Sequence, residues 1–508
     1  MFGRARLLPS QKDQQIVRRA GRSLLERLSA ATAIRLVVKP QWSANRAMDK
    51  SAGRAKIGSP KRGISEHPCR GLDMLIGHPS AAAVEPKAFF LRAGWVVPIS
   101  APPLRDGALL IRDGRIAAIG KAKDIVPDRD CLRLEFPDGI LLPGFINPHT
   151  HLENTHFADK LPRRQPFVQW LKTMRDLVRQ QTWDEALIAA RDGVAGLLRF
   201  GVTCVGDSSF HGATLMALRE IGLRGVVFKE LICPHEEEQD ERWQAFLAWL
   251  NEAPTGELIR LGIMAHAPYT VTPIMLRWAW QLASQRRLPF SIHVAESPEE
   301  RALIERREGV WAHLPIAMAL QKVPTGLSPV RYLDWLGILS EGVLLIHCVQ
   351  VDDADIALLA RAKVWVAHCP RSNANLQVGV MPLAKMLAAG VQVCLATDGL
   401  ASAESLSPLD EIRFALRLSE SHPSLYPALP PQWWLLMVTR DAAAALGMGS
   451  LVGSLEVGKF ADLAVFCIGE EKKEPLEALL HEGREAVMTM VAGCCVYCAE
   501  GVNPVKAP

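Results

Sequence analysis

The feature that most constrains the fold is a series of eight short β-branched runs that begins at position 140 and alternates with stretches of helical pattern. The predicted strands are residues 140–146, 202–205, 225–228, 259–265, 290–293, 343–346, 364–367 and 391–396. Between them, stretches such as 183–200 and 352–362 carry apolar residues at three- and four-residue spacing, which is typical of crossover helices. Eight strand–helix units predict an α/β fold, a (β/α)8 TIM-type barrel, whose active site lies where the strands end.

His149 and His151 follow the first of these runs and are separated by one residue. Successive side chains of a strand point to opposite faces, so residues two apart point to the same side and the two imidazoles converge. Imidazole suits Zn, Fe, Ni or Cu rather than Mg or Ca, which makes the pair suited to a transition metal. A lone pair of this kind is more often two surface or packed histidines, so a metal site requires further ligands downstream.

Polar side chains also follow the later runs. They are His266 after the fourth run, His293 and Glu296 after the fifth, His347 after the sixth, His368 after the seventh and Asp398 after the eighth. In a barrel these positions share one rim, and so many ionisable groups there are better explained by catalysis than by core packing. His347 and His368 compete for the role of supporting the metal centre; we favour His347 and expect His368 to be structural.

Five motifs resemble those of the amidohydrolase superfamily, and within it the cytosine deaminase-like and chlorohydrolase-like branch. They are residues 143–151 (PGFINPHTH), 293–296 (HVAE), 345–348 (LIHC), 396–398 (ATD) and 453–463 (GSLEVGKFADL). The motifs stand in the family's order, which makes the resemblance specific. It implies a small β-sandwich built from both flanks, residues 86–143 and 449–508, beside the barrel at 144–448. The flanks agree, because residues 89–99, 108–119 with a turn at Asp113-Gly114, 461–466 and 486–497 have strand patterns.

The resemblance also assigns roles to the polar residues at the rim. It implies one divalent metal, Zn²⁺ or alternatively Fe²⁺, whose ligands are His149, His151, His293 and Asp398. It makes Glu296 the proton shuttle, His347 the residue that orients water, and Asp398 a base as well as a ligand. A metal held by three neutral imidazoles and one carboxylate retains charge that lowers the pKa of a bound water, which agrees with these roles. The alternative for Glu296 is the solvated start of a helix.

Other chemistries fit the sequence less well. A dinuclear site bridged by a carbamylated lysine usually takes that lysine from the fourth strand, where this chain has His266, and the nearest lysine, Lys229, follows the third. Cytidine-deaminase chemistry needs P-C-x-x-C, but Pro68-Cys69 is followed by Leu72. The sequence contains no serine-hydrolase elbow, P-loop or dinucleotide fingerprint. A non-catalytic barrel would have no physical need to keep the whole ionisable set together.

The predicted reaction is metal-dependent hydrolysis of a non-peptide carbon–nitrogen bond, most simply deamination of an aminated purine nucleoside or related N-heterocycle. The alternative is a chlorohydrolase or cyclic amide hydrolase of the same superfamily. Glu153, His266 and Arg371 are expected to face the cavity above the metal and bind substrate. The motifs at 369–373 (CPRSN) and 397–402 (TDGLAS) resemble the aminodeoxyfutalosine deaminases, with departures at Gly399 and Ala403.

That second resemblance implies an adenosine derivative whose carboxylate is bound by Arg371, because a guanidinium offers a planar fork that matches a carboxylate. The alternative is that Arg371 pairs with a nearby acid and braces its own loop. The expected partner is therefore a small N-heterocyclic molecule. We expect no nucleic acid or membrane partner, and a homodimer is compatible with the sequence.

The first 73 residues differ in charge from the rest. They hold 16 Lys or Arg against 5 Asp or Glu, a balance of +11, and since the whole chain carries +4 the remainder carries −7. Residues 1–85 are expected to be a basic disordered extension, a nucleic-acid or membrane contact, or residues before a true start at Met74; we favour the first or the last. Eleven cysteines without paired spacing, and no apolar stretch of about 18 residues, predict a cytoplasmic protein with reduced thiols.

Overall fold

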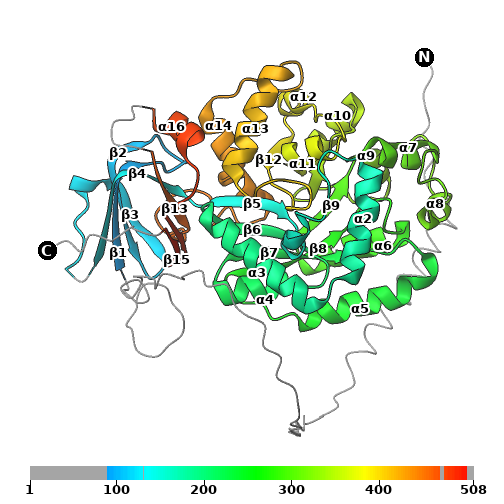
Figure 1. Cartoon of the computed structure of the whole chain (residues 1–508), viewed down its shortest axis with the longest axis horizontal. Coiled ribbons are helices and arrows are strands. Elements are labelled where there is room, and N and C mark those ends of the chain that lie inside the picture. Colours follow the sequence, from blue (N-terminus) through cyan, green and yellow to red (C-terminus); the bar gives the residue numbers. More distant parts are fainter. Residues whose placement is uncertain (1–87, 130, 469–473, 500–508) are drawn as a thin grey trace, which may run out of the picture. The chain divides into compact units, whose positions relative to one another are not determined.

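The computed structural model describes residues 88–129, 131–468 and 474–499, which form a barrel and a smaller sheet (Figure 1). The sequence predictions for residues 1–85 lie outside the described residues. The barrel has eight parallel strands in the order β12-β11-β10-β9-β8-β7-β6-β5. They are β5 (Phe145–Thr150), β6 (Val202–Ser209), β7 (Arg224–Leu231), β8 (Ile259–Ala265), β9 (Phe290–Val294), β10 (Leu344–His347), β11 (Trp365–His368) and β12 (Gln392–Leu395). The predicted (β/α)8 barrel is confirmed.

One predicted strand is wrong in its bounds, because residues 140–146 do not form a single strand. Residues 140–143 end strand β4 of the small sheet, and β5 begins at Phe145. The apolar pattern runs on without a break because both strands are buried. Gly144 lies between them, and a Cβ at this position would lie 2.1 Å from Thr203 Cγ2, so only glycine fits where the chain passes from sheet to barrel.

The barrel is joined between its first and last strands by hydrogen bonds of Asn147. Asn147 Nδ2 donates to Thr397 Oγ1 at 2.6 Å, and Thr397 N donates to Asn147 Oδ1 at 3.1 Å. Asp398 N also donates to the carbonyl of His149 at 3.2 Å. These bonds hold the ends of β5 and β12 together and place His149 beside Asp398.

Alternate residues of the strands fill the barrel interior, while the other faces pack beneath the helices. The interior residues include Ile146, Cys204, Val226, Phe228, Met264, Leu344, Ile346, Ala367, Cys394 and Ala396. On β7 the inward residues are Val226 and Phe228, so Glu230 continues the same face at the carboxyl end of the strand. His266, just after β8, follows Met264 in the same way. Both residues therefore face the mouth of the barrel.

Helices surround the barrel (Figure 1). They are α2 (Phe167–Gln180), α3 (Trp183–Arg199), α4 (Thr214–Ile221), α5 (Gln239–Glu252), α6 (Pro273–Arg286), α7 (Pro298–Arg306), α8 (Pro315–Leu320), α9 (Pro329–Trp335), α10 (Asp353–Ala362), α11 (Pro370–Asn375), α12 (Leu383–Ala388), α13 (Pro408–Ser421), α14 (Pro431–Met437), α15 (Arg440–Ala445) and α16 (Pro475–Glu482). Capping boxes start α3 at Thr182 and α10 at Asp352, satisfying backbone N–H groups of the first turn. Among the described residues, none of the helices is long and apolar enough to cross a membrane.

The small sheet combines strands from both flanks, as predicted, in the order β15-β14-β13-β4-β1-β2-β3. They are β1 (Ala88–Val96), β2 (Leu104–Arg112), β3 (Arg115–Lys121), β4 (Leu132–Pro143), β13 (Leu463–Cys467), β14 (Met488–Val491) and β15 (Cys494–Cys498). Strand β4 joins the two flanks, because it pairs parallel to β1 and antiparallel to β13. The predicted hairpin turns at Asp113 and Gly114, whose φ angles of 48° and 73° suit a type I′ turn.

A buried ion pair joins the barrel to the small sheet. Arg224, the first residue of β7, donates from Nε to Asp462 Oδ2 at 2.7 Å and from Nη2 to Asp462 Oδ1 at 3.0 Å. Asp462 directly precedes β13 and also accepts from Ala492 N at 2.8 Å. The Arg224 guanidinium lies 4.4 Å from the centroid of the Phe460 ring. The pair is bidentate and further hydrogen-bonded, the geometry that a buried pair needs to offset its desolvation.

Candidate active site

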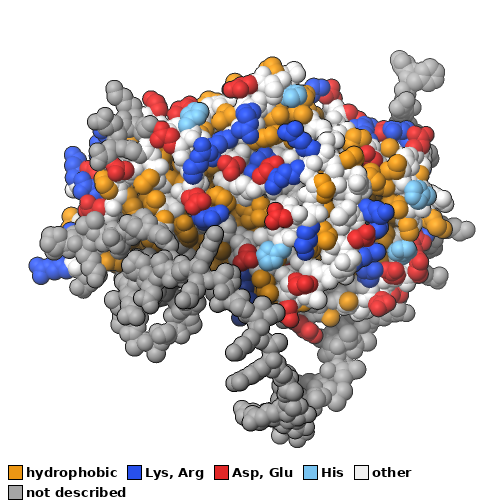
Figure 2. All heavy atoms as spheres, in the orientation of Figure 1, with side chains coloured by type: hydrophobic (Ala, Val, Ile, Leu, Met, Phe, Trp, Pro, Cys, Tyr) orange, Lys and Arg blue, Asp and Glu red, His pale blue; other side chains and the backbone are white. Residues whose placement is uncertain are grey.

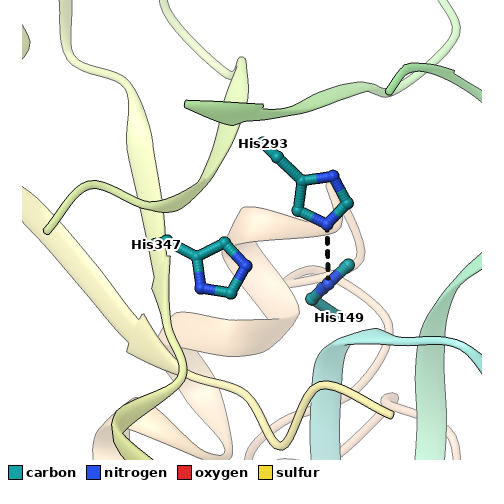
Figure 3. Close-up of side chains that lie close together, drawn as sticks. All are labelled: His149, His293 and His347. Carbon is teal, nitrogen blue, oxygen red and sulfur yellow. Dashed lines mark hydrogen bonds between the residues drawn. The ribbon is translucent and has the colours of Figure 1, made fainter. Parts of the chain in front are cut away.

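Six of the predicted side chains converge at the carboxyl ends of four barrel strands. They are His149 and His151 from β5, His293 and Glu296 from β9, His347 from β10 and Asp398 after β12. All are buried except His151, which is half-buried. Ligand atoms of His149, His293 and His347 lie within 4.8 Å of one another, and so do those of His149, His151 and Asp398. Figure 3 shows the first three, with His293 and His149 pointing toward each other.

The distances around His149 fit a bound cation. Its Nε2 lies 3.3 Å from Nε2 of His293 and 3.4 Å from Asp398 Oδ1, and His151 Nε2 lies 3.6 Å from the same oxygen. On the far side of each ring, His293 Nδ1 donates to the carbonyl of His266 at 2.9 Å, and His149 Nδ1 lies 3.4 Å from Ser208 Oγ. Bonds at Nδ1 leave Nε2 for a metal, which is the usual second contact of a histidine ligand.

Burial keeps these imidazoles neutral. It lowers the pKa of His149 to about 4 and the pKa of His293 well below its usual value, and the neighbouring histidines add to the effect at His293. Because Nδ1 of His293 donates to a carbonyl, its neutral ring presents a lone pair at Nε2, which faces Nε2 of His149 at 3.3 Å. Together with a carboxylate oxygen these nitrogens form a nitrogen and oxygen donor set of the kind that Zn²⁺ and Fe²⁺ prefer. The residues present therefore fit the divalent metal that the sequence predicted.

Asp398 is held as a carboxylate by its own surroundings. Its Oδ2 accepts from Ser372 Oγ at 2.7 Å and Ser402 Oγ at 2.8 Å, and its Oδ1 accepts from Gly399 N at 2.8 Å. Burial acts to raise the pKa of Asp398, but the contact with His149 and the neighbouring histidines hold it well below its usual range. A Cβ at Gly399 would lie 3.1 Å from His151 Cβ, so glycine lets this loop pass close to the metal-binding pair.

Glu296 and His347 face each other on the other side of the cluster. Glu296 Oε1 lies 3.4 Å from His347 Nε2, and His347 Nδ1 lies 2.9 Å from Asn373 Oδ1. Burial, with the Asp398 and Glu300 carboxylates nearby, raises the pKa of Glu296 well above its usual value. A carboxyl group in this state can take a proton and return it, as a general acid–base group must. The alternative of a solvated helix start is wrong, because Glu296 is only 6% exposed.

Several site residues sit on backbone that few non-glycine residues adopt. The φ angles are 51° at Ala295, 74° at His347, 47° at Cys348 and 59° at Asp398, all in the left-handed region. Each such residue costs roughly 1–3 kcal/mol and persists only where surrounding contacts impose it. Glu300 supplies two of these contacts, because its carboxylate accepts from Ala295 N at 2.9 Å and Glu296 N at 2.8 Å. The strain is concentrated where the strands end.

Glu153 was predicted to contact substrate, but its carboxylate is occupied by the protein. It accepts hydrogen bonds from Ser209 Oγ at 2.5 Å and from the backbone N–H groups of His211, Ala213 and Thr214 at 2.8, 2.7 and 3.3 Å. These bonds hold the turn between β6 and α4. The contacts favour a positioning role over the predicted contact with substrate.

Arg371 is likewise engaged by its neighbours. Its Nε donates to Glu411 Oε1 at 2.7 Å and its Nη2 to the carbonyl of Ser405 at 2.6 Å, and both charged side chains are buried. This is the alternative considered from the sequence, in which Arg371 pairs with an acid and braces its loop. The geometry favours that alternative over a free guanidinium waiting for an anionic substrate.

His266 lies at the rim beside the cluster. Its ring centroid is 5.1 Å from that of His293, and its Nδ1 lies 2.7 Å from Thr270 Oγ1. Burial, with smaller effects from His151 and His149, lowers its pKa to about 3, so the ring is neutral. Its Nε2 lies 3.9 Å from Glu230 Oε1, which is too long for a hydrogen bond. His266 therefore lies beside the histidine cluster, and its contact with substrate stays a prediction.

His368 and Lys229, which had been weighed as site residues, lie outside the cluster. His368 Nε2 contacts the hydroxyl of Tyr426, and burial lowers its pKa to about 3, which agrees with the structural role expected for it. Lys229 lies on the outer face of β7, where its ammonium contacts the carbonyl of Phe210 and lies 5.3 Å from the ring of Trp249. This position separates Lys229 from the histidines and offers no support for a bridged dinuclear site.

Sequence reasoning missed the residues that hold the ligands in place. They are Ser208, Ser372, Asn373, Ser402, Glu300, Asn147 and Thr397. Some signals were available: Ser372 and Asn373 stand inside the CPRSN motif, and Ser402 follows Asp398 by four residues. Glu300 carried no signal, because a glutamate in the first turn of a helix is ordinarily a solvated partner of the helix dipole.

Comparison with known proteins agrees with this geometry. Residues 140–496 match the amidohydrolase family. A curated 5-methylthioadenosine/S-adenosylhomocysteine deaminase from Moorella thermoacetica is 33% identical over 72% of this chain and 83% of its own length. A 5'-deoxyadenosine deaminase from Methanopyrus kandleri is 31% identical over 71% of this chain and 80% of its own length.

The fold is also found among solved structures. An adenosine deaminase from Xanthomonas campestris with bound zinc superposes with a TM-score of 0.70 at 27% identity, over 80% of this chain and 92% of its own. The resemblance of the chain to amidohydrolases, first seen in five short motifs, thus extends over the barrel and the strands that flank it.

Proposed function

The chain belongs to the amidohydrolase family, and from this premise we propose that it is a zinc-dependent aminohydrolase that removes the exocyclic amine of an adenosine-type nucleoside. Water replaces the amine, so that the products are the corresponding oxo compound and ammonia. The observation that carries the proposal is the cluster around His149, whose Nε2 lies 3.3 Å from His293 Nε2 and 3.4 Å from Asp398 Oδ1, with Glu296 beside His347.

The ligands of the metal in this proposal are His149, His151, His293 and Asp398. Three neutral imidazoles and one carboxylate suit zinc, and the bound zinc of the Xanthomonas campestris protein supports the choice over iron. When bound, such a metal lowers the pKa of a water molecule toward neutrality and so makes a nucleophile available.

The residues of the chain supply the proton transfers and the orientation. Glu296 takes a proton from the attacking water and delivers it to the amine nitrogen, which leaves as ammonia. His347 lies 3.4 Å from the Glu296 carboxyl and orients the water, while its Nδ1 is fixed by Asn373. Ser372 and Ser402 hold the second oxygen of Asp398, so that Oδ1 keeps its direction toward His149. Burial and the nearby carboxylates raise the pKa of Glu296, which makes it a stronger base toward the proton of the water.

The relatives support an adenosine altered at its 5' position. The names of the two curated relatives include 5-methylthioadenosine, S-adenosylhomocysteine and 5'-deoxyadenosine, which share adenine and the sugar ring and differ in the 5' substituent. A small-molecule partner also suits the surface. On the face in Figure 2, Lys and Arg side chains alternate with Asp and Glu, and a nucleic-acid partner would favour a continuous basic stripe.

We place the enzyme in the cytoplasm. Six described cysteines are free thiols buried inside the barrel and sheet: Cys131, Cys204, Cys233, Cys348, Cys369 and Cys394. Buried reduced thiols suit a reducing compartment.

The test is a substrate panel with metal-loaded protein. We expect ammonia release from adenosine, 5'-deoxyadenosine, methylthioadenosine or S-adenosylhomocysteine, and none from cytosine or a chlorinated triazine. Treatment with a chelator should abolish the activity, and added Zn²⁺ should restore it. Release of chloride from the triazine without deamination of any nucleoside would replace the proposal with the chlorohydrolase alternative.

A further inference from the structure

Glu230 is a buried acid at the barrel mouth that the mechanism does not use. It occupies the inward face of β7 after Val226 and Phe228, and its side chain is 7% exposed. Among the described residues, no hydrogen bond reaches its Oε1. The adjacent Lys229 points to the outer face of the strand and contacts the carbonyl of Phe210, so it forms no ion pair with Glu230.

A buried carboxyl group without a hydrogen-bond partner is unfavourable unless a ligand or another group supplies the missing hydrogen bond. The residue nearest to Oε1 is His266, whose Nε2 is 3.9 Å away and therefore beyond hydrogen-bond distance. Burial, with the charge of Glu153 nearby, raises the pKa of Glu230 to about 8, which reflects the cost of the ionised form when no donor is present. Glu153 itself illustrates the contrast, because four hydrogen bonds from the chain occupy its carboxylate.

The order of the strands fixes where Glu230 meets a ligand. Strand β8 separates β7 from β9, which carries His293, and β6 separates β7 from β5, which carries His149 and His151. Among the described residues, those whose ligand atoms lie within 4.8 Å of one another at the histidine cluster do not include Glu230. Two strand spacings of roughly 5 Å separate β7 from β5 and from β9, and the nearest neighbour of Glu230 Oε1 is His266. This placement favours contact with a part of the substrate away from the reacting carbon.

We propose that Glu230 binds the 2'- and 3'-hydroxyls of the substrate's ribose. The inference rests on the proposed function, and it follows from the donors that a purine nucleoside offers. The adenine of a nucleoside has one donor group, its exocyclic amine, and that group lies at the reacting carbon. The donors away from it are the sugar hydroxyls, and 5'-deoxyadenosine and methylthioadenosine, which lack a 5'-hydroxyl, keep only the 2' and 3' pair. A carboxylate has two oxygens and can accept from two adjacent hydroxyls.

The experiment compares adenosine with 2'-deoxyadenosine and 3'-deoxyadenosine for the wild type, Glu230→Gln and Glu237→Gln. Glu237 is the matched control, an acid whose side chain is 77% exposed. We expect the wild type to favour adenosine over at least one deoxy analogue by about 10-fold or more in kcat/KM, as loss of a hydrogen bond to a charged group implies. In Glu230→Gln this preference should fall to about 2-fold or less, mainly through KM for adenosine, with unchanged metal content. Glu237→Gln should behave as the wild type.

Two outcomes would overturn the inference. One is a wild type that deaminates all three compounds without preference, and the other is a Glu230→Gln variant that loses the same factor for all three or loses nothing. If Glu230→Gln does not fold, Glu230→Asp keeps the charge on a shorter side chain, and its preference for adenosine should then be reduced but present. Failure of the proposed function is a different result, because it would appear as a wild type that deaminates none of these compounds.

Discussion

Two buried groups of charged side chains, one between the barrel and the small sheet and one at the barrel mouth, are organised in opposite ways. Arg224 and Asp462 satisfy each other through two hydrogen bonds and a third from the backbone. At the mouth, Nε2 of His293 and Nε2 of His149 face each other at 3.3 Å, and Glu296 is buried beside another acid. Burying charge is expensive in both places, but only the first region contains the partners that offset the cost.

The difference separates a contact that maintains the fold from a site prepared for a ligand. Arg224 and Asp462 have all their hydrogen-bond partners within the chain, so their role is to stabilise the packing of the small sheet on the barrel. At the barrel mouth, where a lone pair of His293 faces a nitrogen of His149 and the backbone is strained, the stabilisation must come from something that binds. Substitutions at the barrel mouth should therefore change metal content and turnover, whereas substitutions at the Arg224–Asp462 pair should change the free energy of unfolding.

The largest effect is expected from removing a metal ligand. His293→Ala deletes one of the nitrogens around His149, so we expect loss of stoichiometric metal and of measurable deamination while the chain remains folded. Elemental analysis and ammonia release measure the two quantities. His313→Ala, at an exposed histidine, should keep one metal per chain and normal activity. Two tightly bound metals per active wild-type chain would contradict the mononuclear site.

Breaking the ion pair between Arg224 and Asp462 should lower the free energy of unfolding instead. Asp462→Ala leaves the Arg224 guanidinium buried and unpaired, which costs about 3–5 kcal/mol of unfolding free energy. Urea unfolding should measure this loss, whereas the metal content and the kcat of the folded fraction should stay near normal. Replacing both partners with apolar residues, Arg224→Met with Asp462→Leu, should recover most of the stability. If the double variant is as unstable as Asp462→Ala, the pair must stabilise the folded protein by more than the neutralisation of one buried charge by the other.

Glu296→Gln should separate binding from chemistry at the mouth. The amide keeps the size of the side chain but cannot carry a proton from water to the amine, so we expect kcat to fall about 100-fold with metal still bound. Glu299→Gln, three residues further along the chain and half-buried, is the matched control and should retain activity. Near-normal turnover in Glu296→Gln would assign the proton transfer to another group.

The parts of this protein that could be predicted from sequence are those that depend on the pattern of residues close together in the chain. Eight β-branched runs between helical stretches specify the barrel, and ionisable residues directly after those runs must share its rim. The break at Gly144 was missed because an apolar run looks the same whether one buried strand or two pass through it. Only the close approach to Thr203 distinguishes the two cases.

The contacts of Glu153, Glu230 and Arg371 could not be predicted from the sequence, because they depend on which atoms of the chain come near in three dimensions. Glu153 and Glu230 are both glutamates near strand ends. The carboxylate of Glu153 accepts hydrogen bonds from the turn before α4, whereas Oε1 of Glu230 has no hydrogen-bond partner among the described residues. Arg371 stands in a motif that suggested an anionic substrate, but Glu411 lies 40 residues further along the chain and reaches it across the fold. Long-range partners of this kind leave no periodic signal.

The smallest expected effect concerns His368, a histidine at the rim that serves the fold. Its pKa is about 3 in the folded protein, owing to burial, against an ordinary value of 6.5. Between pH 6.5 and 3 the unfolded chain therefore binds one more proton at this residue than the folded chain, so the free energy of unfolding falls as the pH is lowered, by up to about 1.4 kcal/mol per pH unit.

Removing the titrating ring should remove that slope. In metal-free protein, the unfolding free energy of His368→Gln relative to wild type should rise by close to 1.4 kcal/mol, or about one proton, between pH 5.5 and 4.5 as measured by urea unfolding. Tyr426→Phe is the matched control, because it removes the hydroxyl that contacts His368 but keeps the buried ring, and its slope should follow the wild type. An equal difference in unfolding free energy at both pH values would mean that His368 is already protonated in the folded protein over this pH range. Its contact with Tyr426 would then involve a charged imidazolium, and His368 would resemble the charged groups at the barrel mouth rather than a neutral structural residue.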